Sequence, residues 1–405
     1  MDHLLVTAIE KAFGWAGPSA LGTEFTRGRI EDEQLPTRLL TPNGLLELVM
    51  RRHLANPQIR MYSEGQVLHP SGFLTNFVSR RRQASRRADM ASVGRILNEG
   101  GTLILDTINM FDPTLEVACR ALGWWTGETV SVNSYLAVGD TAGFAIHWDD
   151  HDVLCLQVAG EKSWEVRGPS RCVPMYRDTE QNLEPPDDVL WSGTMKPGDL
   201  MHIPRGFWHA ASRVGMGDDG LSMHLTFGIT RRTPITWINY LSDAARSEQL
   251  FRSDLEAPEG HDDALLVDRL AQFARTLPPS EYLRRMREGM APARHIPYVP
   301  ALGPLTGTVA VTEFKPMIEQ TPEGNIEVRA GGKKLIFAAR AEQLVRTLLS
   351  GHPVTFDHDT DPDAVRLAKH MIQEGLCAPL TSESFSGFTG LVPTKTCSTQ
   401  LSAAA

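Results

Sequence analysis

The stretch that decides the fold reads GFAIHWDD at residues 143–150 and closes with IPRGFWH at residues 203–209. On a strand, residues two apart share a face, so His147 and Asp149 are expected to point the same way. His209 reaches the same point if the intervening strands fold back as hairpins. Two imidazoles and one carboxylate on one face of a metal leave three positions open, as in non-haem Fe(II) oxygenases.

The sequence around this His-x-Asp pair distinguishes it from a second copy at His261 and Asp263. The second copy lies in a polar segment before a helical pattern, and we do not expect it to bind metal. The first copy leads into VLCLQVAGEKSWEV at residues 153–166, an apolar run, a glycine turn and an alternating strand, which together predict a hairpin. The alternative is a buried histidine and an exposed aspartate in a β-sandwich that binds no metal.

Several strings spread over residues 130–230 together carry a family resemblance. They are HWDD at 147–150, LQVAGEKSW at 156–164, KPGDL at 196–200, IPRGFWH at 203–209 and SMHLT at 222–226. This pattern resembles the JmjC-type ribosomal oxygenase family. The resemblance implies a double-stranded β-helix, Fe(II) and 2-oxoglutarate. It also implies that His147, Asp149 and His209 bind the iron and form the catalytic centre, and that Lys162 pairs with the distal carboxylate of 2-oxoglutarate.

A physical argument supports the same role for Lys162. A dicarboxylate that chelates the metal at its keto-acid end leaves a second carboxylate inside the barrel, and burying that group unpaired costs several kcal/mol. Lys162 is in phase with Trp164 and Val166 on a strand that otherwise faces the core. The alternative is a solvated lysine on an edge strand.

Three further residues are candidates for co-substrate binding. Asn133 and Tyr135 share one face of a strand predicted over residues 128–139, and the resemblance places both in the co-substrate pocket. Their side chains can donate to a carboxylate, although polar residues on a strand also face solvent. Thr226 is a third candidate. Gly228 departs from the family pattern, because a serine hydroxyl is expected there.

Composition describes a soluble globular protein: of 405 residues, 41% are hydrophobic and 22% charged. We expect it in the cytoplasm, without membrane contact, because no apolar run reaches about 18 residues and the start lacks a basic signal region. Five scattered cysteines predict neither a disulfide framework nor a zinc site. A net charge of -9 argues against coating nucleic acid. The arginine-rich residues 80–87 are a solvated loop or a local contact with RNA or an acidic partner.

The predicted elements indicate an α+β protein that consists of a barrel, a helical region and a small C-terminal module. Caps and periodicity predict helices over 4–13, 42–50, 91–99, 113–122, 234–246, 263–275, 280–290, 341–349 and 363–373, and strands over 102–106, 308–311 and 327–337. The expected parts are an N-terminal helical entry with the first strands (1–100), a JmjC cupin barrel (101–232), a helical dimerisation region (233–300), a winged-helix-like module (301–390) and a disordered tail (391–405). Dimerisation and the winged-helix module rest on the resemblance; a helical region serving one chain is the alternative.

These observations predict an Fe(II)- and 2-oxoglutarate-dependent oxygenase that hydroxylates a protein side chain. The resemblance favours arginine or histidine in a ribosomal protein and a homodimeric enzyme; nucleic acid is not indicated as a partner. The alternatives are a tailoring hydroxylase for a ribosomally made peptide or other natural product, a methyl-lysine demethylase, and a cupin that binds without catalysis. We further expect the acidic loop at 177–188 to help select the substrate.

Overall fold

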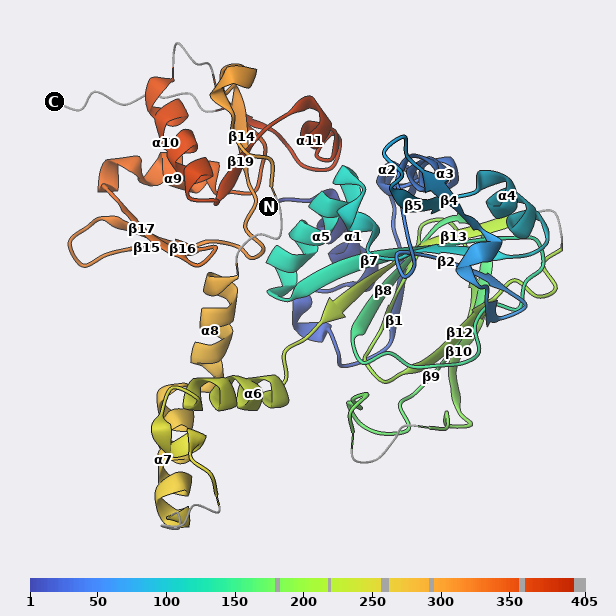
Figure 1. The fold of residues 1–405 in the computed structure, drawn as a ribbon, viewed down its shortest axis with the longest axis horizontal. Coiled ribbons are helices and arrows are strands. Elements are labelled where there is room, and N and C mark those ends of the chain that lie inside the picture. The colour runs from blue at the N-terminus through green and yellow to red at the C-terminus, as the bar shows by residue number, and fades with distance from the viewer. Residues whose placement is uncertain (179–182, 218–219, 256–261, 291–294, 357–360, 397–405) are drawn as a thin grey trace. The chain divides into compact units, whose positions relative to one another are not determined.

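A computed structural model describes residues 1–178, 183–217, 220–255, 262–290, 295–356 and 361–396. The chain forms two compact units, Met1–Thr230 with Leu380–Thr394, and Arg231–Pro379 with Lys395–Ala405 (Figure 1). This differs from the expected division in two respects. Residues 1–100 share a unit with the barrel, and the segment from residue 380 returns to that unit.

The first unit contains the predicted barrel with helices around it. Its helices are α1 (Leu4–Phe13), α2 (Leu35–Leu39), α3 (Pro42–Arg51), α4 (Met90–Asn98), α5 (Pro113–Thr126) and α11 (Ser382–Ser386). Its strands are β1 (Thr26–Arg29), β2 (Ile59–Ser63), β3 (Gln66–Val67), β4 (Leu74–Val78), β5 (Ala84–Ala88), β6 (Thr102–Leu105), β7 (Thr129–Val138), β8 (Asp152–Gly160), β9 (Lys162–Arg167), β10 (Val189–Met195), β11 (Asp199–Ile203), β12 (Trp208–Ser212) and β13 (Leu221–Thr230).

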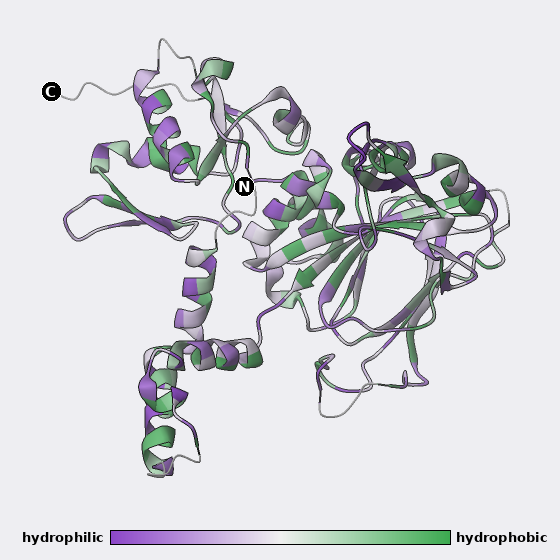
Figure 2. Ribbon diagram, in the orientation of Figure 1, coloured by the Kyte–Doolittle hydropathy of each residue, from purple (hydrophilic) through white to green (hydrophobic). Residues whose placement is uncertain are grey.

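Two antiparallel sheets form the barrel. The larger has the order β1-β11-β8-β13-β7-β6-β2-β3 and the smaller the order β10-β9-β12. One apolar cluster joins them, because it takes side chains from β8 and β11 on one side and from β9, β10 and β12 on the other; its buried members are Val153, Cys155, Trp164, Val166, Met195, Met201, Ile203 and Ala211. In Figure 2 green, hydrophobic positions alternate with white and purple ones along the strands of this unit. The expected barrel of two facing sheets is confirmed.

Local sequence signals set the helices beside the barrel. In α5 the Asp112 side chain accepts from the backbone N–H of Leu115, Pro113 occupies the first turn, and Gly127 ends the helix in the left-handed region at φ 68°. In α3 the Thr41 side chain accepts from the N–H of Gly44. Both helices lie where the sequence predicts them.

The turn between β8 and β9 requires a glycine. Gly160 has φ +60°, and a Cβ built there would lie 1.7 Å from the carbonyl oxygen of Leu221. Since no side chain fits, this position lets β13 approach the turn closely. The turn also fixes the phase of β9, which places Lys162, Trp164 and Val166 on its buried face.

The second unit contains α6 (Pro234–Ala245), α7 (Asp263–Thr276), α8 (Pro279–Gly289), α9 (Glu342–Leu348) and α10 (Pro362–Gln373). Its strands are β14 (Gly307–Ala310), β15 (Met317–Gln320), β16 (Ile326–Ala330), β17 (Lys333–Phe337), β18 (Val354–Thr355), β19 (Cys377–Pro379) and β20 (Lys395–Thr396). They form the sheets β19-β14-β18-β20 and β15-β16-β17. None of the helices in the described part of the chain is long and apolar enough to cross a membrane.

The predicted tail differs from the structure over its first residues. Leu391 and Val392 are buried, and residues 395–396 form β20, which pairs with β18. Apolar side chains that reach a core gain more from burial than composition alone suggests. Residues 397–405 lie outside the described part.

Candidate metal centre

A backbone bridge brings the two candidate histidines together. The N–H of His147 donates to the carbonyl of His209 (3.1 Å), and the N–H of His209 donates to the carbonyl of His147 (2.7 Å). His209 lies on β12, but His147 and Asp149 lie outside the named strands, with only an isolated bridge at His147. The expectation that the pair lies on one strand is therefore wrong. The segment also bonds to the turn at Gly206, whose N–H donates to the Asp149 carbonyl (2.9 Å), and this replaces regular strand pairing.

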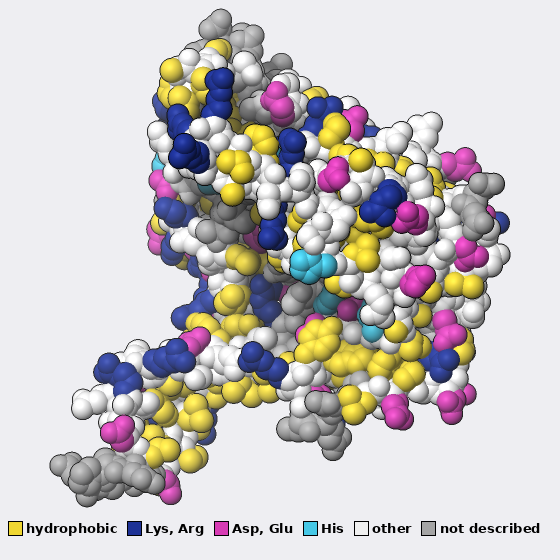
Figure 3. All heavy atoms as spheres, turned by 45° about the vertical axis from the view of Figure 1, so that its right-hand side comes forward, with side chains coloured by type: hydrophobic (Ala, Val, Ile, Leu, Met, Phe, Trp, Pro, Cys, Tyr) yellow, Lys and Arg dark blue, Asp and Glu magenta, His cyan; other side chains and the backbone are white. Residues whose placement is uncertain are grey.

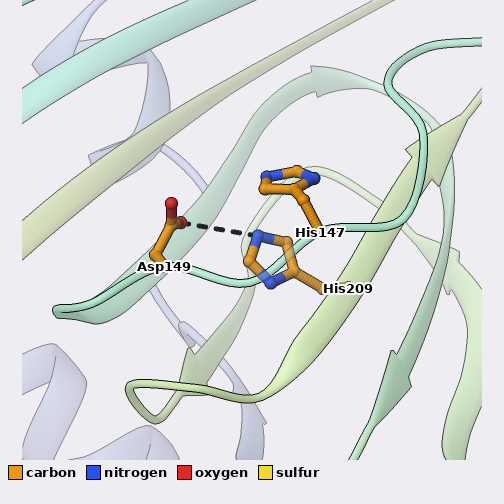
Figure 4. A group of neighbouring side chains, drawn as sticks. All are labelled: His147, Asp149 and His209. Carbon is orange, nitrogen blue, oxygen red and sulfur yellow. Dashed lines mark ion pairs between the residues drawn. The ribbon is translucent and has the colours of Figure 1, made fainter. Parts of the chain in front are cut away.

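His147, Asp149 and His209 form a compact cluster (Figure 4). One ligand atom from each side chain lies within 4.8 Å of the others. His209 Nε2 is 3.6 Å from Asp149 Oδ2, and the two imidazole centroids are 4.4 Å apart. Among the described residues, this cluster is the one group of three or more histidine, cysteine or carboxylate side chains whose ligand atoms lie this close together.

The hydrogen bonds of the histidines leave their outer nitrogens free for a metal. His147 Nδ1 lies 3.0 Å from the carbonyl oxygen of Ala145, and His209 Nδ1 lies 3.1 Å from that of Phe207. A carbonyl only accepts, so each Nδ1 carries the proton and each Nε2 keeps its lone pair. A carbonyl partner that fixes the tautomer is typical of metal-binding histidine.

Burial keeps His209 in the neutral form. Desolvation, with a contribution from the nearby His147, lowers the pKa of His209 to about 4. A neutral imidazole coordinates metal, whereas an imidazolium does not. His209 is buried, whereas Asp149 and His147 are partly exposed, so the cluster opens on one side. Two imidazoles and a carboxylate with an open side fit a divalent metal that keeps free positions for other ligands.

A segment that sequence reasoning missed packs against the cluster. The Tyr176 ring lies 4.9 Å from that of Trp148, and the Tyr176 hydroxyl hydrogen-bonds to Asp149, whose charge contributes to raising the pKa of Tyr176 after the larger effect of burial. Trp208 Nε1 donates to Ser170 Oγ (2.9 Å). Tyr176 precedes the acidic loop, and no local pattern marks it. Of that loop, residues 179–182 lie outside the described part.

Lys162 is fully inside the barrel. Its side chain is 1% exposed, and burial lowers its pKa to about 8. Within the described residues no carboxylate forms an ion pair with it. The alternative of a solvated edge lysine is wrong, because β9 lies between β10 and β12. A buried ammonium without a counter-ion fits a site for an anionic ligand.

His224, on β13, is a second group that sequence reasoning did not single out. Its ring stacks on Tyr135 at 4.7 Å and meets Trp164 edge-on at 5.2 Å. Its pKa is well below the usual value because of burial first and then the nearby Lys162 ammonium. The ring therefore links the surroundings of the lysine and the metal cluster. The sequence signal for His224 was its position two residues before Thr226, which places both side chains on the same face of β13.

A cavity of about 480 Å³ contains two of the three other candidates. Its walls include Asn133, Thr226, Gly228, His151 and an ion pair between Arg60 and Asp106. Tyr135 is packed against His224 and Asn133 lines the cavity, and both side chains are half-buried. The Asn133 Oδ1 already accepts from the N–H of Thr107 (2.8 Å), which leaves its amide N–H groups to donate.

Gly228 lies under the ring of His151. A Cβ at position 228 would be 2.9 Å from both Cδ2 and Nε2 of His151. The serine expected there by resemblance would require the His151 ring to move. In the second His-x-Asp copy, the intervening Asp262 caps α7 by accepting from the N–H of Leu265, and His261 lies outside the described part.

Comparison with known proteins agrees with this geometry. Residues 115–236 match the JmjC domain. The chain is 30% identical over 179 residues to ribosomal oxygenase 1 of Gallus gallus, covering 43% of this chain and 29% of that protein. It is 36% identical over 134 residues to the bifunctional lysine-specific demethylase and histidyl-hydroxylase NO66 of Drosophila persimilis, covering 33% of this chain and 18% of that protein.

The fold extends the likeness beyond the matched segment. The X-ray structure of E. coli ycfD superposes with a TM-score of 0.52 at 18% identity, covering 89% of this chain and 95% of that one. The chain spans under a third of the length of the curated relatives above. The chain therefore contains a JmjC domain over residues 115–236, is similar to ribosomal oxygenases in the matched segments and shares the fold of E. coli ycfD.

Proposed function

We propose that the protein is an Fe(II)- and 2-oxoglutarate-dependent oxygenase that hydroxylates a side chain of a protein substrate. The observation that carries the proposal is the cluster of His147, Asp149 and His209, with ligand atoms within 4.8 Å of one another, in a barrel that also buries the unpaired Lys162. A metal ligand set and a buried cation are what a chelating dicarboxylate needs. The JmjC match supports the same pair of cofactors.

Each residue has a defined part in this proposal. The Nε2 atoms of both histidines and the Asp149 carboxylate hold the iron, and the Nδ1 hydrogen bonds keep the rings oriented. Lys162 pairs with the distal carboxylate of 2-oxoglutarate, and Asn133, Tyr135 and Thr226 line its path. The bound metal and keto acid supply the oxidising power that converts an unreactive C–H bond into C–OH. Trp164 and His224 exclude water from the lysine side of the site.

A ribosomal protein is the substrate class we favour, with arginine or histidine as the hydroxylated residue. The ribosomal oxygenases among the relatives support the class; the choice of side chain follows from the resemblance. The partly exposed His147 marks the open side of the cluster, from which a substrate side chain would enter. Peptide tailoring and demethylation of methyl-lysine are the competing reactions, and the cytoplasm is the expected location.

The test is anaerobic titration of the protein with Fe(II) and 2-oxoglutarate, followed by succinate release in air against a ribosomal extract. We expect the visible absorption of an iron-bound keto acid, and succinate release stimulated by extract. His209→Ala should abolish both, as should His147→Ala and Asp149→Ala. Mass spectrometry of the extract should then locate one added oxygen atom on arginine or histidine of a ribosomal protein.

The other results separate the alternatives. Cofactor binding without stimulation by extract would redirect the search to peptides and natural products. Release of formaldehyde from methyl-lysine peptides would favour demethylation. A protein that fails to bind 2-oxoglutarate in the presence of metal would be a non-catalytic cupin, and the proposal would be abandoned.

We also propose that the helices α6 to α8 mediate homodimerisation. Apolar side chains on α6 and α7 are about half exposed or more, namely Ile235, Ile238, Leu265, Val267 and Leu270. Hydrophobic atoms are visible along the arm of the second unit at the lower left of Figure 3. An exposed apolar face of this kind marks a surface that another protein covers.

The winged-helix-like module at 301–390 is proposed as a protein-contact or structural element. Its helices α9 and α10 carry arginines that are already paired, Arg346 with Glu342 at 2.8 Å and Arg366 with Asp363 at 2.8 Å. Paired arginines offer little free charge to a nucleic acid backbone. This charge pattern supports a role other than DNA recognition.

A further inference from the structure

The β-hairpin of β4 and β5 is a separate two-stranded sheet in the first unit (Figure 1). Its register pairs Leu74 with Ala88 and Val78 with Ala84. The tip is closed by two hydrogen bonds, from the N–H of Arg82 to the Ser79 carbonyl (2.8 Å) and from the N–H of Ser79 to the Gln83 carbonyl (2.9 Å). Residues 75–78 and 80–84 are all exposed, so both faces of the ribbon are open to solvent over this length.

Five arginines gather on this ribbon: Arg80, Arg81 and Arg82 at the tip, and Arg86 and Arg87 on β5. All five are exposed. Residues 65–88 contain no aspartate or glutamate, and within the described part of the chain none of the five arginines forms an ion pair. In a chain of net charge -9, this is a concentrated and unneutralised positive surface. The free charge is therefore available to a partner.

An exposed aromatic ring lies within the same surface. The Arg87 guanidinium lies 5.1 Å from the centroid of the Phe77 ring, and Phe77 is 40% exposed. His53, which follows α3, meets the same ring edge-on, with the two ring centroids 6.3 Å apart. Phe77 thus offers a planar apolar surface next to the Arg87 guanidinium, and His53 connects this ring to the rest of the first unit.

We propose that the hairpin Leu74–Ala88 binds RNA, with its arginines on the phosphate backbone and Phe77 against a base. Arginine forks pair with phosphate in two-hydrogen-bond geometry, and aromatic or guanidinium planes stack on unpaired bases. An acidic protein segment would also use the charge, but the exposed ring beside the arginines favours RNA, because every nucleotide carries both a phosphate and a base that can stack. This binding does not depend on the metal centre, so it stands or falls separately from the proposed oxygenase activity.

The test is fluorescence anisotropy of a labelled single-stranded RNA of mixed sequence, titrated with the full-length protein over a range of salt concentrations. The variant replaces Arg80, Arg81, Arg82, Arg86 and Arg87 by glutamine. We expect its Kd to rise by more than tenfold at low salt. The slope of log K against log salt should fall by about 3 to 4, since each lost phosphate contact removes about 0.7 for a single strand. Phe77→Ala should weaken binding at every salt concentration without changing that slope.

A matched control removes the same charge elsewhere. Glutamine replaces five exposed arginines that each pair with an acid three or four residues away: Arg51, Arg95, Arg246, Arg346 and Arg366. The control should bind RNA within about threefold of the wild type, and both variants should keep the thermal unfolding midpoint of the wild type.

Equal losses in the two variants would mean a general charge effect and would overturn the proposal. So would wild-type protein that fails to bind RNA, or that binds polyglutamate as tightly as RNA, because the latter outcome identifies an acidic protein as the partner.

Discussion

Lys162 shows how a single residue can be kept for binding at the expense of stability. Its pKa falls from 10.5 to about 8 because burial penalises the ammonium. At neutral pH the charged ammonium has a lower free energy in the unfolded chain, where it is solvated, than in the folded protein, where it is buried. The shift of roughly 2.5 units corresponds to about 3 kcal/mol, as an upper estimate. A bound carboxylate would remove this cost, which is the physical reason to expect a ligand there.

Replacing Lys162 by methionine should therefore stabilise the ligand-free protein and weaken co-substrate binding. We expect the free energy of unfolding at pH 7 to rise, by up to about 3 kcal/mol, since the new side chain needs no counter-ion. The Kd for 2-oxoglutarate, measured by calorimetry with Mn(II) in place of Fe(II), should rise by at least tenfold. Loss of stability together with unchanged Kd would show that Lys162 has a structural role.

Binding of 2-oxoglutarate should depend on pH through the same group. The folded pKa of about 8 lies below the unfolded value of 10.5, so the unfolded state binds more protons between these values. Stability of the ligand-free protein then rises from pH 8 to 10.5, while affinity for the anion falls as the ammonium loses its proton. Calorimetry from pH 7 to 9.5 should show this decline, and Lys162→Arg should remove it because guanidinium stays charged. A flat profile in the wild type would contradict the ion pair.

Gly228 and His151 should behave as a coupled pair. Gly228→Ser places a Cβ 2.9 Å from two atoms of the His151 ring, so we expect a lower unfolding midpoint and weaker 2-oxoglutarate binding. Adding His151→Ala to that variant frees the space and should restore much of both losses. Gly168→Ser serves as control, because its Cβ meets only Leu190 at 4.0 Å. Additive effects in the double variant would exclude the coupling.

At the scale of elements, the β8–β9 turn determines where the ligand-binding lysine points. Lys162 is the first residue of β9 and pairs with Met195 of β10. Because side chains alternate along a strand, a shift of one residue in this turn would turn Lys162 out of the barrel and Ser163 into it. The close contact at Gly160 is what fixes the register.

Gly160→Ala tests this turn. Its φ of +60° and the 1.7 Å approach to the Leu221 carbonyl predict a loss of at least about 2 kcal/mol of stability and weaker 2-oxoglutarate binding through displacement of Lys162. Gly94→Ala in α4 is the matched control, since nothing lies within 4 Å of its Cβ. In a helix that change should be neutral or stabilising, by up to about 1 kcal/mol. Chemical denaturation of both variants measures their free energies of unfolding and shows whether only Gly160→Ala is destabilised.

At the scale of the whole molecule, α6 and α7 set the expected oligomeric state. Ile238 on α6 and Leu270 on α7 are 50% and 47% exposed. Sedimentation equilibrium should report a dimer for the wild type, and Ile238→Glu with Leu270→Glu should shift it to monomer, since burying two unpaired carboxylates opposes association. Glutamate at Leu302, which is 86% exposed on a short turn, should leave the dimer intact. A monomeric wild type would leave these helices serving one chain alone.

The sequence by itself determined what depends on neighbours along the chain. Alternation placed Lys162 with Trp164 and Val166, caps placed α3 and α5, and the spacing of histidine and aspartate marked the metal cluster. These signals are local, because side-chain period and helix capping act within a few residues.

Only the tertiary structure decided the contacts between distant segments. It bridged His147 to His209 outside any regular strand, laid His151 over Gly228, brought Tyr176 to Asp149, and returned residues 380–394 to the first unit. The physical reason is that loop paths follow from packing and closure over the whole fold. The periodicity of the sequence does not indicate which loops contact one another in the folded protein.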